Sequence, residues 1–288
     1  MKTIVLSDHA ADQLRTREAE RQSRYEAGMQ AYEGRLQARQ KRIDEGRARR
    51  RAACEQKRYL WAMGYALVVV SHRLKKLMES HGRPVKELPG LEDHIWQQGQ
   101  EGEDGLAEFL AQTLDDQYIL IKGYKNRRGE IDQILVGPNG IFAAEVKNCK
   151  GTIYCRGDVW TRDKTDNWGN QVLFGEPIVD RGGRSPSRQV NESADLLEAF
   201  LKKTMPSCKV HRNIIFTNGD ADLGDLQDLT VDGAFLMRNW KPQGMLREST
   251  SWLTAREVEV AIHQIERDHR YHQERRHARS ASHPGRAA

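Results

Sequence analysis

Residues 129–147 constrain the fold of this chain more than any other stretch, because charged residues interrupt two short apolar runs there. The runs cover residues 131–136 and 141–146, and Gly-Pro-Asn-Gly separates them at residues 137–140. Asn-Gly readily adopts the positive φ values that a hairpin turn needs, so the pattern predicts a strand, a tight turn and a second strand. The charged residues within the two runs and at their end are Asp132, Glu145 and Lys147.

Successive residues of a strand point to opposite faces, so Glu145 and Lys147 share one face and Val146 lies on the other. A hairpin turn at residues 137–140 would bring Asp132 close to Glu145. Two carboxylates and an ammonium group on a mostly apolar hairpin are unfavourable unless a partner compensates them. Mg²⁺ would be such a partner, since it binds one or two protein carboxylates together with water and substrate phosphate. The alternative is a structural ion pair at the edge of a hairpin.

Four motifs follow one another along the chain. They are Gly-Gln-Glu-Gly-Glu at 99–103, Gly-Glu-Ile-Asp at 129–132 with Glu-Val-Lys-Asn at 145–148, Pro-Ser-Arg-Gln at 186–189, and Ile-Ile-Phe-Thr at 214–217. In this order, and with Gly151 and Ile153, they resemble the nuclease-related domain (NERD), a branch of the PD-(D/E)xK nuclease superfamily. The resemblance covers about residues 96–220. The first ninety residues lie outside it, and the segment between Trp160 and Pro186 carries residues that the family pattern does not match.

The resemblance implies an α/β fold with a restriction-endonuclease-like mixed sheet and flanking helices. It also implies a Mg²⁺- or Mn²⁺-dependent deoxyribonuclease, an endonuclease or a related DNA-processing enzyme, with RNA as the alternative substrate. Asp132 and Glu145 would bind the metal, together with the main-chain carbonyl of Val146 and with Glu103 directly or through water.

Lys147 and Gln189 complete the catalytic set that the resemblance implies. Lys147 would orient the attacking water or neutralise the charge that develops on the phosphate, and Gln189 would position substrate or water. A helix is expected at residues 91–114, and it carries both Glu103 and Glu108. From spacing alone either glutamate could be an ordinary solvent-facing residue or the third carboxylate; the resemblance selects Glu103.

The nuclease-related domain is expected to span residues 91–265. Its expected helices lie at residues 91–114, 186–203 and 254–265, and its expected strands at 118–124, 131–136, 141–146, 152–156, 210–217 and 233–237. Residues 157–188, with five glycines and the isolated Trp160 and Trp168, and residues 220–232 are expected to be loops. Residues 266–288 are expected to form a disordered basic tail, in which His269, His272 and His277 add pH-dependent charge rather than bind metal.

Residues 1–85 are predicted to form a helical, coiled-coil-like arm, because residues 8–80 contain no proline and few turn signals. Spacings of three and four connect Leu60, Met63, Leu67, Val70, Leu74 and Leu77, as in a heptad seam. The seam is weaker upstream, where Arg39, Gly46 and Ala53 occupy seam positions. The arm is expected either to self-associate, giving a homodimer, or to pack back on the domain.

Charge is distributed unevenly along the chain. The net charge is about +9 for residues 1–90, −7 for 91–265 and +3 for 266–288. Basic ends around an acidic core suit a polyanion such as DNA that needs a metal to approach the core. The residues expected to contact nucleic acid are Arg47, Arg49, Arg50 and Arg51 in the arm and Arg127 and Arg128 in a basic turn between strands. The arm could equally bind an anionic membrane surface or be merely a solvated helix.

Cysteine and hydropathy patterns suggest a reduced, cytoplasmic protein. The four cysteines form no Cys-x-x-Cys pair, and no secretory signal is visible in the first residues. The longest nearly uncharged apolar run, residues 59–70, is far shorter than the roughly 20 residues of a membrane-spanning helix. The alternatives to a nuclease are a non-catalytic nucleic-acid binder and a membrane-associated scaffold, each with a residual nuclease fold.

Overall fold

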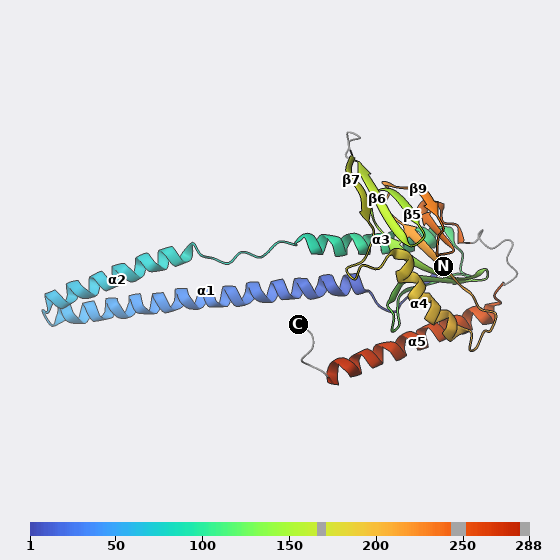
Figure 1. Ribbon diagram of the computed structural model, residues 1–288. Coiled ribbons are helices and arrows are strands. Elements are labelled where there is room, and N and C mark those ends of the chain that lie inside the picture. The colour runs from blue at the N-terminus through green and yellow to red at the C-terminus, as the bar shows by residue number, and fades with distance from the viewer. Residues whose placement is uncertain (166–170, 243–251, 283–288) are drawn as a thin grey trace. The chain divides into compact units, whose positions relative to one another are not determined.

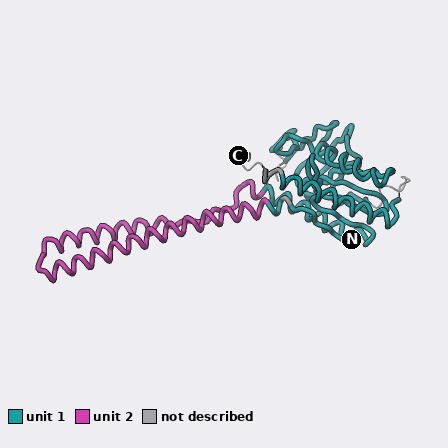
Figure 2. The backbone as a smooth tube through the Cα atoms, turned by 90° about the horizontal axis from the view of Figure 1, so that it is seen from below, with its two compact units in different colours: residues 1–12, 95–288 teal, residues 13–94 magenta. Residues whose placement is uncertain are grey.

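The computed structural model divides into two compact units, shown in different colours in Figure 2. One unit consists of Met1–Asp12 and Ile95–Ala288, and the other is Gln13–His94. The structure describes residues 1–165, 171–242 and 252–282. The fold is α/β, with a long helical segment before the main part of the sheet domain. The first residues belong to the sheet unit, so the expectation that residues 1–85 form one arm is wrong at its beginning.

A mixed sheet of six strands forms the centre of the first unit (Figure 1). Its order is β1 (Lys2–Val5), β2 (Ile119–Lys125), β3 (Glu130–Gly137), β4 (Gly140–Lys147), β8 (Val210–Phe216) and β10 (Gly233–Leu236). Strands β2, β3 and β4 are antiparallel neighbours, whereas β1 pairs parallel with β2, β8 with β4 and β10 with β8. The expected hairpin is therefore the middle of the sheet.

The β3–β4 hairpin turns through Pro138 and Asn139, with Gly137 paired to Gly140. Gly140 has a φ of +131°, a conformation that is accessible to glycine and strained for other residues. The register continues to the pair Gln133 and Ala144, one step before the charged residues. The tight turn thus fixes which residues of the two strands face each other.

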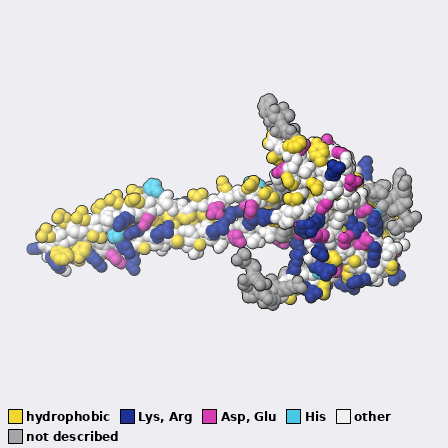
Figure 3. All heavy atoms as spheres, in the orientation of Figure 1, with side chains coloured by type: hydrophobic (Ala, Val, Ile, Leu, Met, Phe, Trp, Pro, Cys, Tyr) yellow, Lys and Arg dark blue, Asp and Glu magenta, His cyan; other side chains and the backbone are white. Residues whose placement is uncertain are grey.

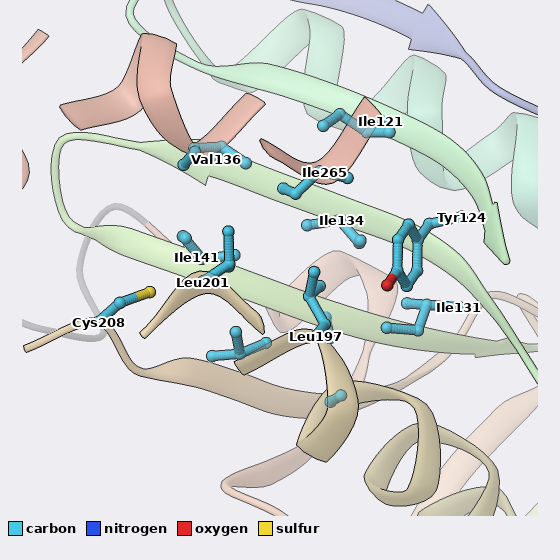
Figure 4. Packing of buried hydrophobic residues seen from close by; sticks show 14 of the residues in the cluster. Ile121, Tyr124, Ile131, Ile134, Val136, Ile141, Leu197, Leu201, Cys208 and Ile265 are labelled. Carbon is cyan, nitrogen blue, oxygen red and sulfur yellow. The ribbon is translucent and has the colours of Figure 1, made fainter. Parts of the chain in front are cut away.

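Helices cover both faces of the six-stranded sheet (Figure 1). Helices α4 (Pro186–Leu201) and α5 (Ala255–Ser282) pack on one face, where Ile134 of β3 meets Leu197 and Ile265 (Figure 4). Helix α3 (Leu91–Thr113) packs on the other face through Leu106 and Leu110. The alternation of strand side chains between two buried faces explains the nearly continuous apolar sequence of β3 and β4.

A second sheet of four strands was not expected from the sequence. Its order is β7 (Gln171–Pro177), β6 (Val159–Thr165), β5 (Gly151–Arg156) and β9 (Ala221–Gln227). The expected loops at residues 157–188 and 220–232 are therefore wrong over β6, β7 and β9, and the strand near 152–156 lies outside the main sheet. Trp160 is buried in this second sheet, and its Nε1 donates to the Ser187 hydroxyl at 2.8 Å, whereas Trp168 lies outside the described residues.

The expected disordered tail is also wrong within the described residues, because α5 continues to Ser282. The helix begins after Thr254, whose hydroxyl caps it and whose main-chain N–H donates to Glu257, as the capping-box pattern predicts. Asp268 and His269 are buried against β2: Tyr124 donates to Asp268 at 2.5 Å, and the Lys125 main-chain N–H donates to His269 Nδ1 at 3.0 Å. Burial lowers the pKa of His269.

The second unit is a hairpin of two helices, α1 (His9–Glu55), whose first turn lies in the other unit, and α2 (Tyr59–Ser80). The weak upstream seam of α1 faces α2, where Tyr32, Ile43 and Ala53 are buried. A Cβ at Gly46 would lie 2.8 Å from the Val69 side chain, so glycine permits the close approach of the helices. Arg39 forms an ion pair with Glu79 at 3.0 Å, which explains a charged residue in the seam.

No described helix of the chain combines the length and the apolar character that crossing a membrane requires.

Helix α2 has two different seams of three-four spacing. Residues 62, 65, 69, 72, 76 and 79 are buried or half-buried, and this seam contains Ala62 and Val69, which are buried. The seam found in the sequence, which we call the apolar seam, consists of Leu60, Met63, Leu67, Val70, Leu74 and Leu77 and is 50–82% exposed. Figure 3 shows hydrophobic side chains gathered along α2. The strongest heptad pattern of the chain is thus not the one that joins α2 to α1.

Candidate active site

The end of the β3–β4 hairpin brings Asp132 and Glu145 together. The hairpin register pairs Gln133 with Ala144, so the next residue on each strand continues this pairing. The Val146 main-chain N–H donates to Asp132 Oδ2 at 2.7 Å, which fixes the carboxylate against β4. The sequence expectation that folding of the hairpin places these two carboxylates near each other agrees with this arrangement.

Lys147 lies between Glu145 and the first turn of α4. Its Nζ donates to Glu145 Oε1 at 2.6 Å and to Gln189 Oε1 at 3.2 Å. Gln189 is held in turn, because its Nε2 donates to the Arg184 carbonyl at 2.9 Å. The hydroxyl of Ser185 caps α4, and Pro186 occupies its first position, so the Pro-x-x-Gln motif sets the place of Gln189.

Glu103 reaches the site from α3 because the preceding residue is a glycine. A Cβ at Gly102 would lie 2.7 Å from Thr217 Oγ1 and 2.9 Å from Asn148 Cβ, so only glycine permits this approach of α3 to the ends of β4 and β8. The Gln133 side chain donates to the Glu103 carbonyl at 2.5 Å. Glu108, the alternative from spacing, is exposed further along α3.

We call Glu103, Asp132, Glu145 and Lys147 the charge cluster. Burial, together with the charge of Asp132, raises the pKa of Glu145 to about 8 and that of Glu103 to about 9. Burial also raises the pKa of Asp132, which Lys147 and the Val146 N–H partly offset. Burial lowers the pKa of Lys147, but Glu145 and Asp132 outweigh this effect and raise it. Each carboxylate of the cluster is therefore disfavoured in its charged form, whereas the ammonium is favoured.

Three carboxylates against one ammonium leave the charge cluster short of positive charge. Oxygen ligands and excess negative charge suit a hard divalent cation. Glu145 is only 3% exposed, but the Lys147 side chain is 23% exposed, so the cluster is open to solvent on that side. Within residues 1–165, 171–242 and 252–282, no three His, Cys, Asp or Glu side chains form a ready-made metal site. The donor set fits a Mg²⁺ ion that binds two carboxylates and completes its shell with water and phosphate, rather than a closed protein cage.

The residues expected to contact nucleic acid are not part of the charge cluster. Arg127 and Arg128 lie on the exposed turn between β2 and β3, and the Arg184 side chain donates to the Arg128 carbonyl at 3.2 Å. The remaining four are exposed on α1 in the other compact unit: Arg47, Arg49, Arg50 and Arg51.

Arg184 is a residue of the site that the sequence analysis missed. Its carbonyl holds Gln189, its positive charge lowers the pKa of Glu145, and Asp180 fixes its side chain at 2.8 Å. It precedes the Pro-x-x-Gln motif by two residues, within a segment that was expected to be a loop. A cationic residue shortly before the Pro-x-x-Gln motif is the signal that could have identified Arg184.

Comparison with protein-family models matches residues 98–217 to the nuclease-related domain. The matched segment includes all four residues of the charge cluster and Gln189. No curated protein and no solved structure matches the chain. The order of the four motifs and the convergence of their polar residues at one end of the sheet agree with this match: residues 98–217 of the chain are similar to the nuclease-related domain (NERD).

Proposed function

We propose that this protein is a Mg²⁺-dependent nuclease that hydrolyses DNA phosphodiester bonds. The observation that carries the proposal is the contact of Lys147 with Glu145, beside the buried carboxylate of Asp132, in a nuclease-related domain. A protein that only binds nucleic acid needs no such arrangement, because two carboxylates repel phosphate unless a cation lies between them.

The residues of the charge cluster have separate roles in this proposal. Asp132 and Glu145, with Glu103 and the Val146 carbonyl, would hold the metal ion, which polarises the scissile phosphate and acidifies a bound water when it is present. Glu145 and Gln189 hold the ammonium group of Lys147 on two sides, so this side chain has a fixed position. It therefore orients the attacking water or neutralises the charge that develops on the phosphate.

Gln189 holds Lys147 in place and would position the substrate or a water. Its amide oxygen accepts from Lys147, and its amide nitrogen is occupied by the Arg184 carbonyl. The side chain of Gln189 consequently has a fixed direction. This role for Gln189 is positioning rather than proton transfer.

The experiment is incubation of the purified full-length protein with supercoiled, linear and single-stranded DNA and with RNA, with and without Mg²⁺ or Mn²⁺. We expect cleavage of DNA that requires the divalent ion and stops when it is chelated. Cleavage that persists in excess chelator would contradict a metal-dependent mechanism, and binding of DNA without cleavage under all conditions would favour the non-catalytic alternative.

We further propose that the apolar seam of α2 binds the same seam of a second copy of this chain. Ten large apolar side chains of α2 are exposed, including all six of the seam. A monomer rarely exposes a contiguous apolar patch larger than a few hundred Å², and larger patches mark interaction sites.

The pattern of this surface favours a second copy over lipid. Spacings of three and four fit the knobs and holes of an identical helix, whereas lipid requires no fixed spacing. The residues beside the seam include Gly64, Ala66 and Ser71, whose small side chains allow close helix packing. Because α1 already covers the opposite face of α2, two hairpins would join as a bundle of four helices.

Light scattering of the full-length protein at several concentrations tests this arrangement. We expect a dimer that dissociates on dilution, and co-sedimentation with anionic vesicles no greater than that of a soluble control protein. A concentration-independent monomer would mean that the chain covers the seam itself. A monomer that sediments with vesicles would assign the seam to a membrane surface.

A further inference from the structure

The sheet unit contains a second polar feature that the charge cluster does not use, a depression between α4 and α5. It has a volume of about 690 Å³, within the range of ligand sites, and a neighbouring cavity adds about 230 Å³. Arg127, His272 and Arg275 line both, so the two form one depression, which we call the basic cavity. None of the charge-cluster residues lines it.

The basic cavity carries far more positive than negative charge. Its cationic side chains are Arg127, Lys203, Arg267, Arg275 and Arg276. Its one carboxylate, Asp268, is buried: one oxygen accepts from the Tyr124 hydroxyl, and the other lies 3.7 Å from Nε2 of His272. In the part of the chain that the structure describes, none of the five cations forms an ion pair with a carboxylate. An anion is therefore the ligand that this lining favours.

Two aromatic rings lie among these cations. Lys203 and Arg267 contact the Phe200 ring at 5.5 and 5.4 Å from its centroid, and Arg275 contacts the Tyr271 ring at 5.4 Å. Tyr271 is 50% exposed. Proteins that bind single-stranded nucleic acid combine these two features, since cations follow the phosphates and aromatic faces stack with bases. A duplex offers the phosphates but keeps its bases stacked on each other.

Two elements connect the basic cavity with the charge cluster. Helix α4 carries Gln189 in its first turn and Phe200 near its end, about 16 Å apart along the helix axis. The turn between β2 and β3 carries Arg127 and leads directly into the strand of Asp132. This turn is fixed to α4, because the Asn126 side chain donates to the Ser193 carbonyl at 2.9 Å. The same helix and the same turn therefore carry residues of both the basic cavity and the charge cluster region.

We propose that the basic cavity binds a single strand of the nucleic acid whose phosphodiester is cut at the charge cluster. The cations bind its phosphates, and Tyr271 stacks with a base. The inference rests on the proposed nuclease function for the choice of a nucleic acid as ligand. It makes single-stranded DNA, or a duplex with a single-stranded tail, the preferred substrate over blunt duplex.

The test is binding of a fluorescein-labelled oligothymidine to the full-length protein in metal-free buffer, where cleavage does not interfere, followed by fluorescence anisotropy. The double variant Arg267→Glu/Arg275→Glu should weaken binding at least about tenfold and reduce the slope of log affinity against log salt by about 1.4, as expected for two lost phosphate contacts on a single strand. Arg270→Glu is the matched control, because Arg270 is exposed on the same helix but lines neither cavity.

A pair of variants at Tyr271 separates stacking from charge. Tyr271→Ala should weaken binding about fivefold or more, the lower range for loss of one stacked base, whereas Tyr271→Phe keeps the ring and should bind as the wild type does. If Tyr271→Phe and Tyr271→Ala bound equally weakly, the hydroxyl that accepts from Arg275 at 2.7 Å, rather than the ring, would matter for binding, and the stacking assignment would be wrong.

The outcomes for the basic cavity and for the nuclease are distinguishable. Loss of binding in Arg267→Glu/Arg275→Glu but not in Arg270→Glu supports the cavity even if no cleavage is ever observed. Equal affinity of all three proteins for the oligothymidine overturns the cavity proposal, even if cleavage depends on the charge cluster. Equal wild-type affinity for oligothymidine and blunt duplex would also overturn the preference for a single strand.

Discussion

Charged side chains are buried at the end of the β3–β4 hairpin, whereas large apolar side chains are exposed along α2. Both regions reverse the usual distribution of residues in a folded protein. In the charge cluster, Asp132 and Glu145 raise the free energy of the chain when no cation is bound. In the apolar seam, Leu60 and Leu67 remain in contact with water. Each region would thus be stabilised by something that the isolated chain lacks, a cation in one case and an apolar surface in the other.

The two regions differ in how firmly the fold holds them. Asp132 accepts a hydrogen bond from the Val146 main chain, and Lys147 donates hydrogen bonds to Glu145 and Gln189. The cluster is therefore pre-organised before any ligand binds. The seam has no comparable constraint, since only the opposite face of α2 contacts α1. Substitutions in the cluster should therefore affect chemistry, and substitutions in the seam should affect assembly.

The largest effect should follow Asp132→Asn. This change keeps the shape of the side chain but removes the charge that would hold the metal ion. We expect the DNA cleavage rate to fall by about 10³-fold, since the metal would stabilise the developing charge and loss of such stabilisation costs about 10²–10³. The molecular mass by light scattering should not change. Cleavage at the wild-type rate in Asp132→Asn would remove the cluster from the mechanism.

Lys147→Ala should lower the cleavage rate by about 10²–10³-fold while metal affinity is largely retained, because an ammonium group stabilises charge but does not ligate a cation. Calorimetric titration with Mn²⁺ measures the affinity, and Asp132→Asn serves as the control that loses it. If Lys147→Ala bound metal as poorly as Asp132→Asn, the contact with Glu145 would be structural and the division of roles incorrect.

Leu67→Lys/Leu74→Lys should weaken the dimer about 100-fold or more, because burial of each leucine contributes about 1.5–3 kcal/mol. Gln30→Lys/Gln37→Lys adds the same charge at exposed positions of α1 and should leave the mass unchanged. Cleavage by the monomeric variant should persist, since the charge cluster lies in the other compact unit. A double variant with the same mass as the wild type would show that the seam is not the interface.

Deletion of residues 1–85 would not isolate the contribution of the helical arm, although the sequence suggests that these residues form only the arm. The deletion would also remove β1, whose Thr3 pairs with Leu120 of β2 at the edge of the main sheet. Loss of activity in such a truncation would therefore not distinguish the arm from the sheet, whereas substitutions on α2 do.

The smallest expected effect concerns stability and pH. The pKa of Glu103 rises from 4.5 in the unfolded chain to about 9 in the fold, so between these values the folded state binds more protons and stability falls as pH rises. In metal-free buffer at pH 8, Glu103→Gln should be more stable than the wild type by about 1 kcal/mol, a value reduced by the partial exposure of this side chain.

Thermal unfolding at pH 5 and pH 8 provides the measurement for Glu103. The advantage of Glu103→Gln should disappear at pH 5, where the wild-type carboxyl is protonated in the fold. Glu108→Gln, on the exposed side of the same helix, should show no difference at either pH. A pH-independent gain in Glu103→Gln would indicate a change in packing rather than in charge.

The sequence alone predicted the hairpin and the residues that meet at its end. Two apolar runs around Gly-Pro-Asn-Gly permit one register, and that register carries Asp132 to Glu145 because strand neighbours are fixed by the turn. The Pro-x-x-Gln motif likewise predicted where α4 begins, and Thr254 with Glu257 predicted the beginning of α5. All these features depend on short-range interactions that local sequence determines.

Tertiary structure decided the features that depend on distant partners. Strand β6 is rich in polar residues, and β7 and β9 each contain a glycine. All three become strands through their neighbours in the second sheet, so their sequences alone indicate loops. In the sequence, Asp268 and His269 belong to a charged segment that indicates a tail. In the fold they are buried, because Tyr124 donates to Asp268 and the Lys125 main-chain N–H donates to His269.

The choice between the two seams of α2 also lay beyond the sequence. The larger apolar residues form the seam that the sequence predicts to be buried. The structure instead packs α1 against the smaller Ala62 and Val69, because the absence of a side chain at Gly46 lets the two helices approach closely there. Periodicity therefore determined that α2 is a helix with an apolar face. The shape of the partner helix determined which face is buried.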